Sequence, residues 1–357
     1  MNPERLPPWW DPYSCQPRKL AAGDKPRVRV SNIVEYLKVA ATAAAASPAV
    51  AARYFAPLRA ARPAPADFVG LSVTPDDALD DAVVDMVAEL GVRRLLYRVP
   101  CWESDDLDRY LEFMERFPDC DFTVNILQHR DSIADPHTWQ RQVHEIAAAL
   151  APRVGAFQVG NAVNRSKWGC RHTGDALRLT DHALAALEGI DGVTVAASSV
   201  IDFEPLVTLR TLVNFHRQQY DVCAAELYVN RRGSPYNRQF GLFDLERKIR
   251  LIAAMAAVST TGARRLWITE TNWPLLDTKP YTPNSGHPRS TVDEATQARY
   301  LTEYYRIAWR TGLVECVYWW QLVNPGYGLV DHRDGTLRKL PSYRAFAALL
   351  EGGLESA

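Results

Sequence analysis

One carboxylate stands at the end of an apolar stretch in residues 267–274, which read WITETNWP. Glu270 closes the strand-like part of this run, and a tryptophan lies on either side of it. A single acid in such an aromatic setting is typical of a nucleophile that attacks a bound substrate, more than of a core residue. The pattern predicts a catalytic site around Glu270.

A second stretch, residues 157–164 (FQVGNAVN), ends a strand-like run at Gly160-Asn161 and is followed by Trp168-Gly169. Other strand-like runs also end in polar or aromatic residues. These are Arg98, Glu226, Tyr228, Glu270, Trp320 and Gln321. A structural role would explain any one of these residues equally well. Together with Asn161 they mark the ends of five strand-like runs, and this favours one common site.

The elements that would position these residues alternate between strand-like runs and amphipathic helices. Glycines at 91, 189, 262 and 312 are predicted to end helices, and Asp135-Pro136 is predicted to begin one. Eight strands are predicted, at residues 68–73, 93–99, 122–127, 154–160, 193–199, 221–228, 265–270 and 314–320. This α/β pattern predicts a (β/α)8 TIM barrel, whose active site lies at the C-terminal ends of the strands. A doubly wound open sheet is the alternative, but no GxGxxG follows the first strand.

Composition and charge limit the kinds of partner and the cell compartment that we expect for this protein. The chain has 357 residues, 47% of them hydrophobic, and a formal net charge of −1, so it has no overall charge that would attract nucleic acid or an anionic membrane. Six cysteines lie far apart without a CxxC pair, which indicates reduced, mostly buried thiols. No basic stretch followed by an apolar core opens the chain, so we expect a cytoplasmic protein.

Residues 1–65 form an N-terminal extension, residues 66–350 the barrel and residues 351–357 a tail, with the boundary at the prolines of 62–65. In the extension, residues 27–47 are predicted to form an Ala-rich helix. The uncharged run of residues 39–52 is interrupted by Pro48 and is too short to span a bilayer. We expect this helix to dock on the barrel with little apolar surface exposed. A peripheral contact with a membrane surface, or with a partner, is the alternative. Its apolar positions include Ile33, Val34, Tyr36, Leu37 and Val39.

Residues from about 66 to 350 resemble clan-A glycoside hydrolases, closest to the family 39-like barrels associated with bacterial polysaccharide loci. The motifs that carry the resemblance are Gly160-Asn161 with Trp168-Gly169, residues 268–270 with Trp273-Pro274, residues 291–300, and residues 327–331. Together they are fairly specific for the clan and say little about the sugar.

The resemblance implies a role for each matching residue. Glu270 would be the nucleophile that forms a glycosyl-enzyme intermediate, and Arg98 and Tyr228 would hold it ionised and oriented. Asn161 would bond the sugar hydroxyl next to the anomeric carbon. Trp320 would form the floor of the subsite. Trp168 and Trp273 are retained as aromatic surfaces that could stack on sugar rings.

Ala162 departs from the family pattern, because it stands where the glutamate that protonates the leaving oxygen is expected. A methyl group cannot donate a proton, and loss of general acid catalysis costs about 10²- to 10⁴-fold in rate. Three explanations remain open: a natural pseudoenzyme that only binds a glycan, an engineered Glu-to-Ala variant, or an enzyme with a relocated acid. Glu226 is the main candidate for that acid, and Glu103, Asp202 and Glu204 are weaker ones.

Other chemistries find little support in the sequence. His144-Glu145 lacks the second histidine of a zinc motif, and His137 and His144 on one predicted helix are better explained as surface residues. No GxSxG motif or phosphate-binding loop occurs, and basic residues form only isolated pairs. We therefore expect no cofactor, no metal, no nucleic-acid partner and no transmembrane segment. The expected partner is a glycan.

Overall fold

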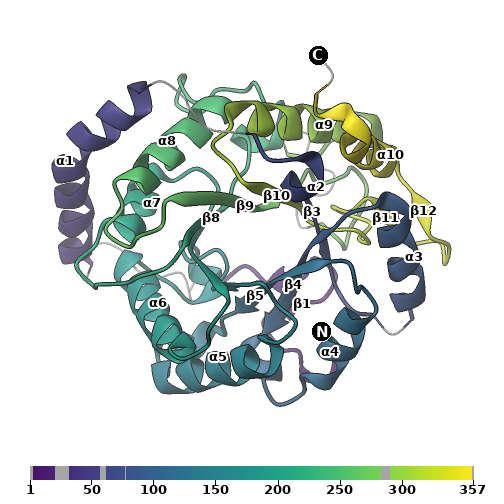
Figure 1. Ribbon diagram of the computed structural model, residues 1–357, viewed down its shortest axis with the longest axis horizontal. Coiled ribbons are helices and arrows are strands. Elements are labelled where there is room, and N and C mark those ends of the chain that lie inside the picture. Colours follow the sequence, from purple (N-terminus) through teal and green to yellow (C-terminus); the bar gives the residue numbers. More distant parts are fainter. Residues whose placement is uncertain (1–2, 21–31, 57–61, 77, 283–289, 356–357) are drawn as a thin grey trace.

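The computed structural model describes residues 3–20, 32–56, 62–76, 78–282 and 290–355. Eight parallel strands close into a barrel in which β10 pairs with both β9 and β3 (Figure 1). The strands are β3 (Val69–Val73), β4 (Arg94–Pro100), β5 (Asp121–Leu127), β6 (Ala156–Val159), β7 (Thr194–Ile201), β8 (Val222–Glu226), β9 (Arg265–Thr271) and β10 (Cys316–Trp319). The predicted TIM barrel is confirmed, and each of the eight predicted strands overlaps an observed one.

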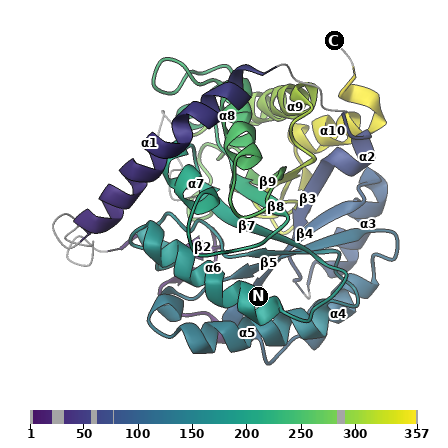
Figure 2. The ribbon, with the colours of Figure 1, turned by 60° about the vertical axis from the view of Figure 1, so that its left-hand side comes forward.

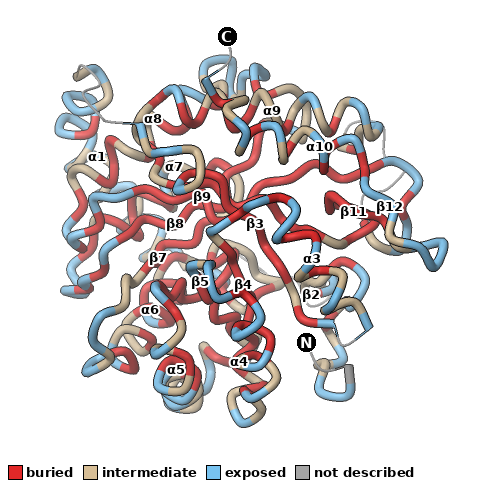
Figure 3. Tube along the Cα trace, turned by 45° about the vertical axis from the view of Figure 1, so that its right-hand side comes forward, coloured by how far each residue is buried: buried red, intermediate tan, exposed pale blue. Residues whose placement is uncertain are grey.

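Helices surround the barrel, and the ring they form encloses the buried strands (Figures 1 and 3). They are α3 (Asp80–Leu90), α4 (Asp108–Glu115), α5 (Pro136–Leu150), α6 (Thr173–Leu187), α7 (Pro205–Leu212), α8 (Leu245–Ala257), α9 (Glu294–Thr311) and α10 (Pro341–Ala348), with the short α2 (Pro65–Phe68) ahead of β3. The predicted helix signals act as expected. Asp135 accepts a hydrogen bond from the Thr138 amide at 3.1 Å, and Gly312 ends α9 in the left-handed conformation.

The barrel interior combines two large aromatic side chains with very small ones. Trp267 and Tyr318 point inward together with Ala156, Ala196 and Ala224. The Tyr318 hydroxyl lies 2.9 Å from the Thr123 hydroxyl across the barrel, which satisfies both buried polar groups. Small residues on the facing strands therefore leave the volume that the two rings occupy.

Helix α1 (Ile33–Phe55) continues through Pro48, so the predicted interruption at that proline is wrong. The carbonyl that Pro48 leaves without an amide donor belongs to Ala44, which is exposed, so water can replace the lost bond. The helix α1 is long enough and apolar enough to cross a membrane, by length and composition only. The uncharged run of residues 39–52 is only part of this longer helix, so the length limit drawn from that run does not apply to α1.

Helix α1 contacts α7 and α8 on the outside of the barrel (Figure 2), but it leaves much of its apolar surface uncovered. Val50 is its one buried residue among those described, whereas Leu37 is 62% and Phe55 80% exposed. The contact uses a narrow stripe of mostly small side chains that includes Ala43 and Ala46. The expectation of little exposed apolar surface is therefore wrong for this helix.

The first residues of the chain form a structure that the sequence did not predict. After a 3-10 turn, η1 (Pro3–Arg5), the short strands β1 (Trp10–Asp11) and β2 (Gln16–Pro17) pair in an antiparallel hairpin. A second small pair, β11 (Val330–Asp331) and β12 (Arg338–Lys339), follows β10. The hairpin of residues 10–17 becomes important for the site, because it lies at the end of the barrel where the strands finish.

Gly70 allows a direct test of barrel packing. A Cβ atom at this position would lie 2.5 Å from the Tyr318 ring, which fills the barrel and has little room to move. Gly70→Ala should lower the free energy of unfolding by about 1–3 kcal/mol through overpacking, measured by chemical denaturation. The matched control is Gly155→Ala, where the nearest atom would be 3.9 Å away and little change is expected. Equal stability of the two variants would contradict this account of the interior.

Candidate active site

Glu270 is held between two side chains from other strands. Its carboxylate accepts a hydrogen bond from the Arg98 guanidinium, with which it forms an ion pair, and another from the Tyr228 hydroxyl. Arg98 comes from β4, Glu270 from β9, and Tyr228 from just beyond β8. The contacts expected from the strand ends are thus present. Both carboxylate oxygens are engaged in a site where the glutamate is only 8% exposed.

The two partners are themselves restrained. Burial, and then the negative charge of Glu270, raise the pKa of Tyr228 well above its ordinary value, so the phenol stays protonated and donates to the carboxylate. The Arg98 guanidinium lies over the Trp320 ring at 3.4 Å from its centre. This stacking fixes the plane of the cation without removing its hydrogen-bond donors. The carboxylate is therefore presented in one orientation.

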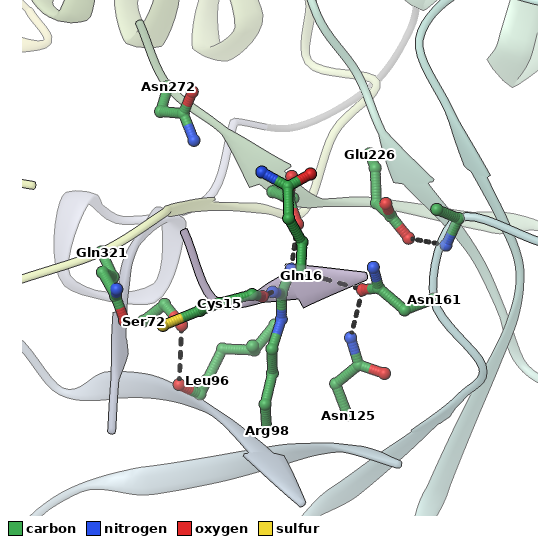
Figure 4. Close-up of polar contacts among 12 residues, drawn as sticks. Cys15, Gln16, Ser72, Leu96, Arg98, Asn125, Asn161, Glu226, Asn272 and Gln321 are labelled. Atoms are coloured by element: carbon green, nitrogen blue, oxygen red, sulfur yellow. Dashed lines mark hydrogen bonds and ion pairs between the residues drawn. The ribbon is translucent and has the colours of Figure 1, made fainter. Parts of the chain in front are cut away.

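Asn161 is positioned by Arg98 and by two residues, Asn125 and Gln128, that sequence analysis did not identify. Its side-chain oxygen accepts from Asn125 at 2.7 Å and from Arg98 at 3.4 Å. Gln128 bonds both the backbone amide and the backbone carbonyl of Asn161, each at 2.8 Å. The amide group that would meet a sugar hydroxyl is therefore connected to the arginine that orients Glu270 (Figure 4).

A cavity of about 490 Å³ opens at Glu270, and the N-terminal hairpin forms part of its wall. The Cys15 carbonyl accepts from Arg98 at 3.4 Å, and the Gln16 side chain accepts from Lys167. Figure 4 shows Cys15 and Gln16 beside Arg98 at the centre of the site. A segment far from the barrel motifs in sequence thus limits the space available to a ligand.

Ala162 is fully buried and does not line this cavity. Its methyl group packs in a small apolar cluster with Trp10, Leu127 and Trp168, and the Trp10 and Trp168 rings meet edge to face at 5.7 Å. The space around position 162 is therefore occupied by the N-terminal hairpin.

Glu226 lies at the end of β8 with no exposed surface, outside the residues that line the cavity. One of its carboxyl oxygens accepts from the Ala162 amide at 2.7 Å, and the other has no hydrogen-bond partner within the described chain. Burial and the nearby charge of Glu270 raise its pKa well above the ordinary 4.5. Its environment therefore favours the protonated form, and its carboxyl group anchors the backbone at 162 (Figure 4).

The three weaker acid candidates lie in different environments. Asp202 lines the cavity, and its carboxylate pairs with Arg165 at 2.6 Å. Glu204 pairs with the same arginine and precedes α7 without lining the cavity. Glu103 is fully buried and accepts from the Tyr110 hydroxyl. Of these three, Asp202 alone could reach a ligand.

The tryptophans divide into two groups. Trp168 and Trp320 line the cavity beside Glu270. Trp273 does not, because it is fully buried, stacks on Trp319 at 6.0 Å and donates to the Gly233 carbonyl at 2.9 Å. The prediction that Trp273 binds substrate is therefore wrong, since the residue belongs to the packing between the barrel and α9.

The described residues contain no group of three or more histidine, cysteine, aspartate or glutamate side chains that could hold a metal ion. All six cysteines are free thiols, and four of them are buried. Burial raises the pKa of Cys101 and Cys223 to about 12, so neither is a reactive thiolate. The described lining of the cavity carries carboxylate, guanidinium, amine, amide and phenol groups, together with the Ser14 hydroxyl and the Cys15 thiol.

Glu226→Gln tests the protonation of the buried acid. Above pH 4.5 the unfolded chain releases the Glu226 proton, whereas the folded protein keeps it. The contribution of Glu226 to the free energy of unfolding is therefore complete below pH 4.5. That contribution is lost as the pH rises toward the raised pKa of the folded protein. Glutamine cannot ionise, so the melting temperature of the variant should rise relative to wild type as the pH increases above 4.5.

The matched control for this measurement is Glu112→Gln, on the exposed side of α4. Glu226→Ala should instead destabilise the protein, because the buried Ala162 amide loses its acceptor at a cost of about 1–3 kcal/mol. A difference between Glu226→Gln and wild type that stays constant with pH would show that Glu226 is ionised in the folded state.

No profile of a known protein family matches the sequence, and no curated protein is similar to it. Solved structures with the same fold do exist. The virulence factor SghA, solved with the substrate analogue salicin, is 13% identical with a TM-score of 0.57 and covers 88% of this chain and 98% of its own.

Two further structures are similar to the same degree. A family 1 β-glucosidase from Thermotoga maritima is 10% identical with a TM-score of 0.59 and covers 82% of this chain and 99% of its own. A family 5 xyloglucanase from Paenibacillus pabuli is 11% identical with a TM-score of 0.54 and covers 81% and 99%. A family 30 endoxylanase also matches. The chain is thus structurally similar to clan-A glycoside hydrolases of families 1, 5 and 30.

Proposed function

We propose that this protein is a retaining glycoside hydrolase-like barrel of the family 39 type that acts on a bacterial glycan and in which only the nucleophile half of the catalytic pair is intact. The single observation that carries the proposal is the arrangement at Glu270. A carboxylate bonded by Arg98 and by Tyr228 stands in a cavity with Trp320 and Asn161. The fold shared with glycoside hydrolases supports this assignment, although fold alone does not determine function.

The chemistry assigned to Glu270 is attack on the anomeric carbon of a bound sugar. A carboxylate oxygen forms a bond to that carbon while the bond to the leaving oxygen breaks, and the electron pair leaves with the aglycone. Water then cleaves the glycosyl ester and releases the sugar and the free carboxylate. Arg98 and Tyr228 return the carboxylate to its starting orientation after each cycle.

The missing partner is the acid that protonates the leaving oxygen. A retaining site requires a second carboxyl group roughly 5 Å from the nucleophile. The described cavity offers no carboxyl at position 162, Glu226 has no exposed surface, and the lining carboxylate of Asp202 is already paired with Arg165. We therefore expect natural glycosides to react slowly and glycosides with good leaving groups to react well, because a stable leaving anion needs no proton.

A non-catalytic glycan-binding protein is the second candidate, and the packing of Ala162 favours it. An engineered Glu-to-Ala change would leave space where the longer side chain had been, whereas Ala162 is enclosed by Trp10 and Trp168. That enclosure supports a natural alanine. In such a protein the residues around Glu270 would serve recognition, with Trp168 and Trp320 as apolar surfaces for sugar rings.

Trapping the intermediate tests the proposal. Wild-type protein is incubated with 2,4-dinitrophenyl 2-deoxy-2-fluoroglycosides of several configurations, and intact-protein mass spectrometry follows adduct formation. We expect a glycosyl adduct that peptide mapping places on Glu270. The Glu270→Gln variant should give none, whereas Asp202→Asn and Glu226→Gln should still be labelled. With unfluorinated substrates, added azide should speed turnover, because it replaces water without needing a general base.

A second arm returns an acid to position 162. Ala162→Glu combined with Trp10→Ala provides both the carboxyl group and the space for it. This double variant should hydrolyse natural glycosides about 10²- to 10⁴-fold faster than Trp10→Ala alone. Absence of any adduct with wild type, together with no gain in the double variant, would exclude the hydrolase-like function and leave the glycan-binding one.

A further inference from the structure

The cavity around Glu270 carries an excess of positive charge. Three acidic side chains line it, against six basic ones. The basic residues are Arg18, Lys19, Arg98, Arg165, Lys167 and Arg232. The chain as a whole is close to neutral, with a formal net charge of −1, so this excess is a local feature of the site.

The three acidic side chains are already engaged. Glu270 pairs with Arg98, and Asp202 pairs with Arg165 at 2.6 Å. Asp11 accepts from the Ser14 hydroxyl at 2.5 Å and from the Tyr13 amide at 3.2 Å within its own turn. These pairs account for two of the six cations. The remaining basic groups have no carboxylate of the cavity as counterion.

Lys167, in the 3-10 helix η4 (Ser166–Trp168), is one of these groups. Its amine donates to the neutral Gln16 side chain, and it forms no ion pair within the described chain. Burial lowers its pKa to about 8, an effect that the Glu270 charge opposes, so the amine is mostly protonated at neutral pH. Holding a charged ammonium in such a position costs free energy unless an anion compensates it.

Arg232, at the end of η5 (Asn230–Arg232), is the second. Its guanidinium lies 3.0 Å from the centre of the Tyr228 ring and donates to the Asn272 carbonyl and side-chain oxygens at 3.3 and 3.2 Å. These acceptors are neutral, so its charge also lacks a carboxylate partner within the described chain. Tyr228 bonds Glu270 directly, so Arg232 lies against a residue that holds the Glu270 carboxylate.

We propose that the glycan bound at Glu270 carries an anionic oxygen group on its sugar, and that Lys167 and Arg232 form its binding site. Lys167 approaches the cavity from the loop after β6, and Arg232 approaches it from the loop after β8. A carboxylate of a uronic acid or a sulfate ester supplies the counterion that both groups lack. A neutral glycan supplies no such counterion. This inference rests on the proposed glycan site and specifies the class of sugar.

Calorimetric binding to matched oligosaccharides tests the inference. Tetrasaccharides of glucuronic, galacturonic and mannuronic acid are compared with the neutral tetrasaccharides of the parent hexoses and with 6-sulfated forms of the latter. We expect at least one anionic glycan to bind about tenfold or more tightly than its neutral counterpart at low salt, with the preference reduced at high salt. Preference for the uronate or for the sulfated form identifies which anion the site takes.

Variants then assign the preference to the two residues. Lys167→Gln and Arg232→Gln should each reduce the preference for the anionic glycan about fivefold, which corresponds to roughly 1 kcal/mol. The charge-preserving Lys167→Arg should retain most of it. Lys38→Gln, on the exposed part of α1, is the matched control and should change nothing. Melting curves of all variants identify any that have lost their fold.

The possible failures are distinguishable. Equal or tighter binding of the neutral glycans overturns the inference and leaves the proposed function in place. The same holds if Glu270 is labelled by neutral activated glycosides while no anionic glycan binds. If neither labelling nor glycan binding occurs, the proposed function fails and this inference fails with it.

Discussion

The ion pair between Arg98 and Glu270 is the interaction on which the rest of the site depends. The two residues lie on β4 and β9, which are separated by β10 and β3 in the barrel, so only the closed sheet brings them together. Removing one partner of a buried pair leaves an uncompensated charge at a cost of about 3–5 kcal/mol. The arginine therefore both stabilises the fold at the mouth of the barrel and sets the chemistry of the carboxylate.

Around this pair, the carboxyl groups on the two sides of the site are held in different ways. Tyr228 supplies the second bond to Glu270, while Asn161 joins the same network through Arg98. On the other side, Ala162 is enclosed, and Glu226 is turned toward the backbone at 162 as an uncharged group. Under the proposed function, this arrangement provides for nucleophilic attack and substrate orientation, and it does not provide for proton donation. This asymmetry is consistent with a protein whose role favours recognition or slow turnover.

The N-terminal hairpin explains why the surroundings of Ala162 differ from those of Glu270. Trp10 fills the space next to Ala162, and Gln16 bonds Lys167 at the wall of the cavity. The hairpin therefore packs against position 162 and bonds a basic side chain at the wall of the cavity. The exposed apolar face of α1 lies elsewhere, on the outside of the helical ring (Figure 2), and has no described connection to the site.

The sequence by itself determined the barrel, because apolar runs, helix caps and left-handed glycines are local signals that each element carries within its own residues. It also placed Glu270, Arg98 and Tyr228 at one rim, since the ends of parallel strands meet there. Contacts that join distant segments were decided only by the tertiary structure. Neither the packing of Trp10 beside Ala162 nor the burial of Trp273 is indicated by the residues next to them in the sequence. The same holds for α1, where Pro48 is tolerated because the affected turn faces solvent.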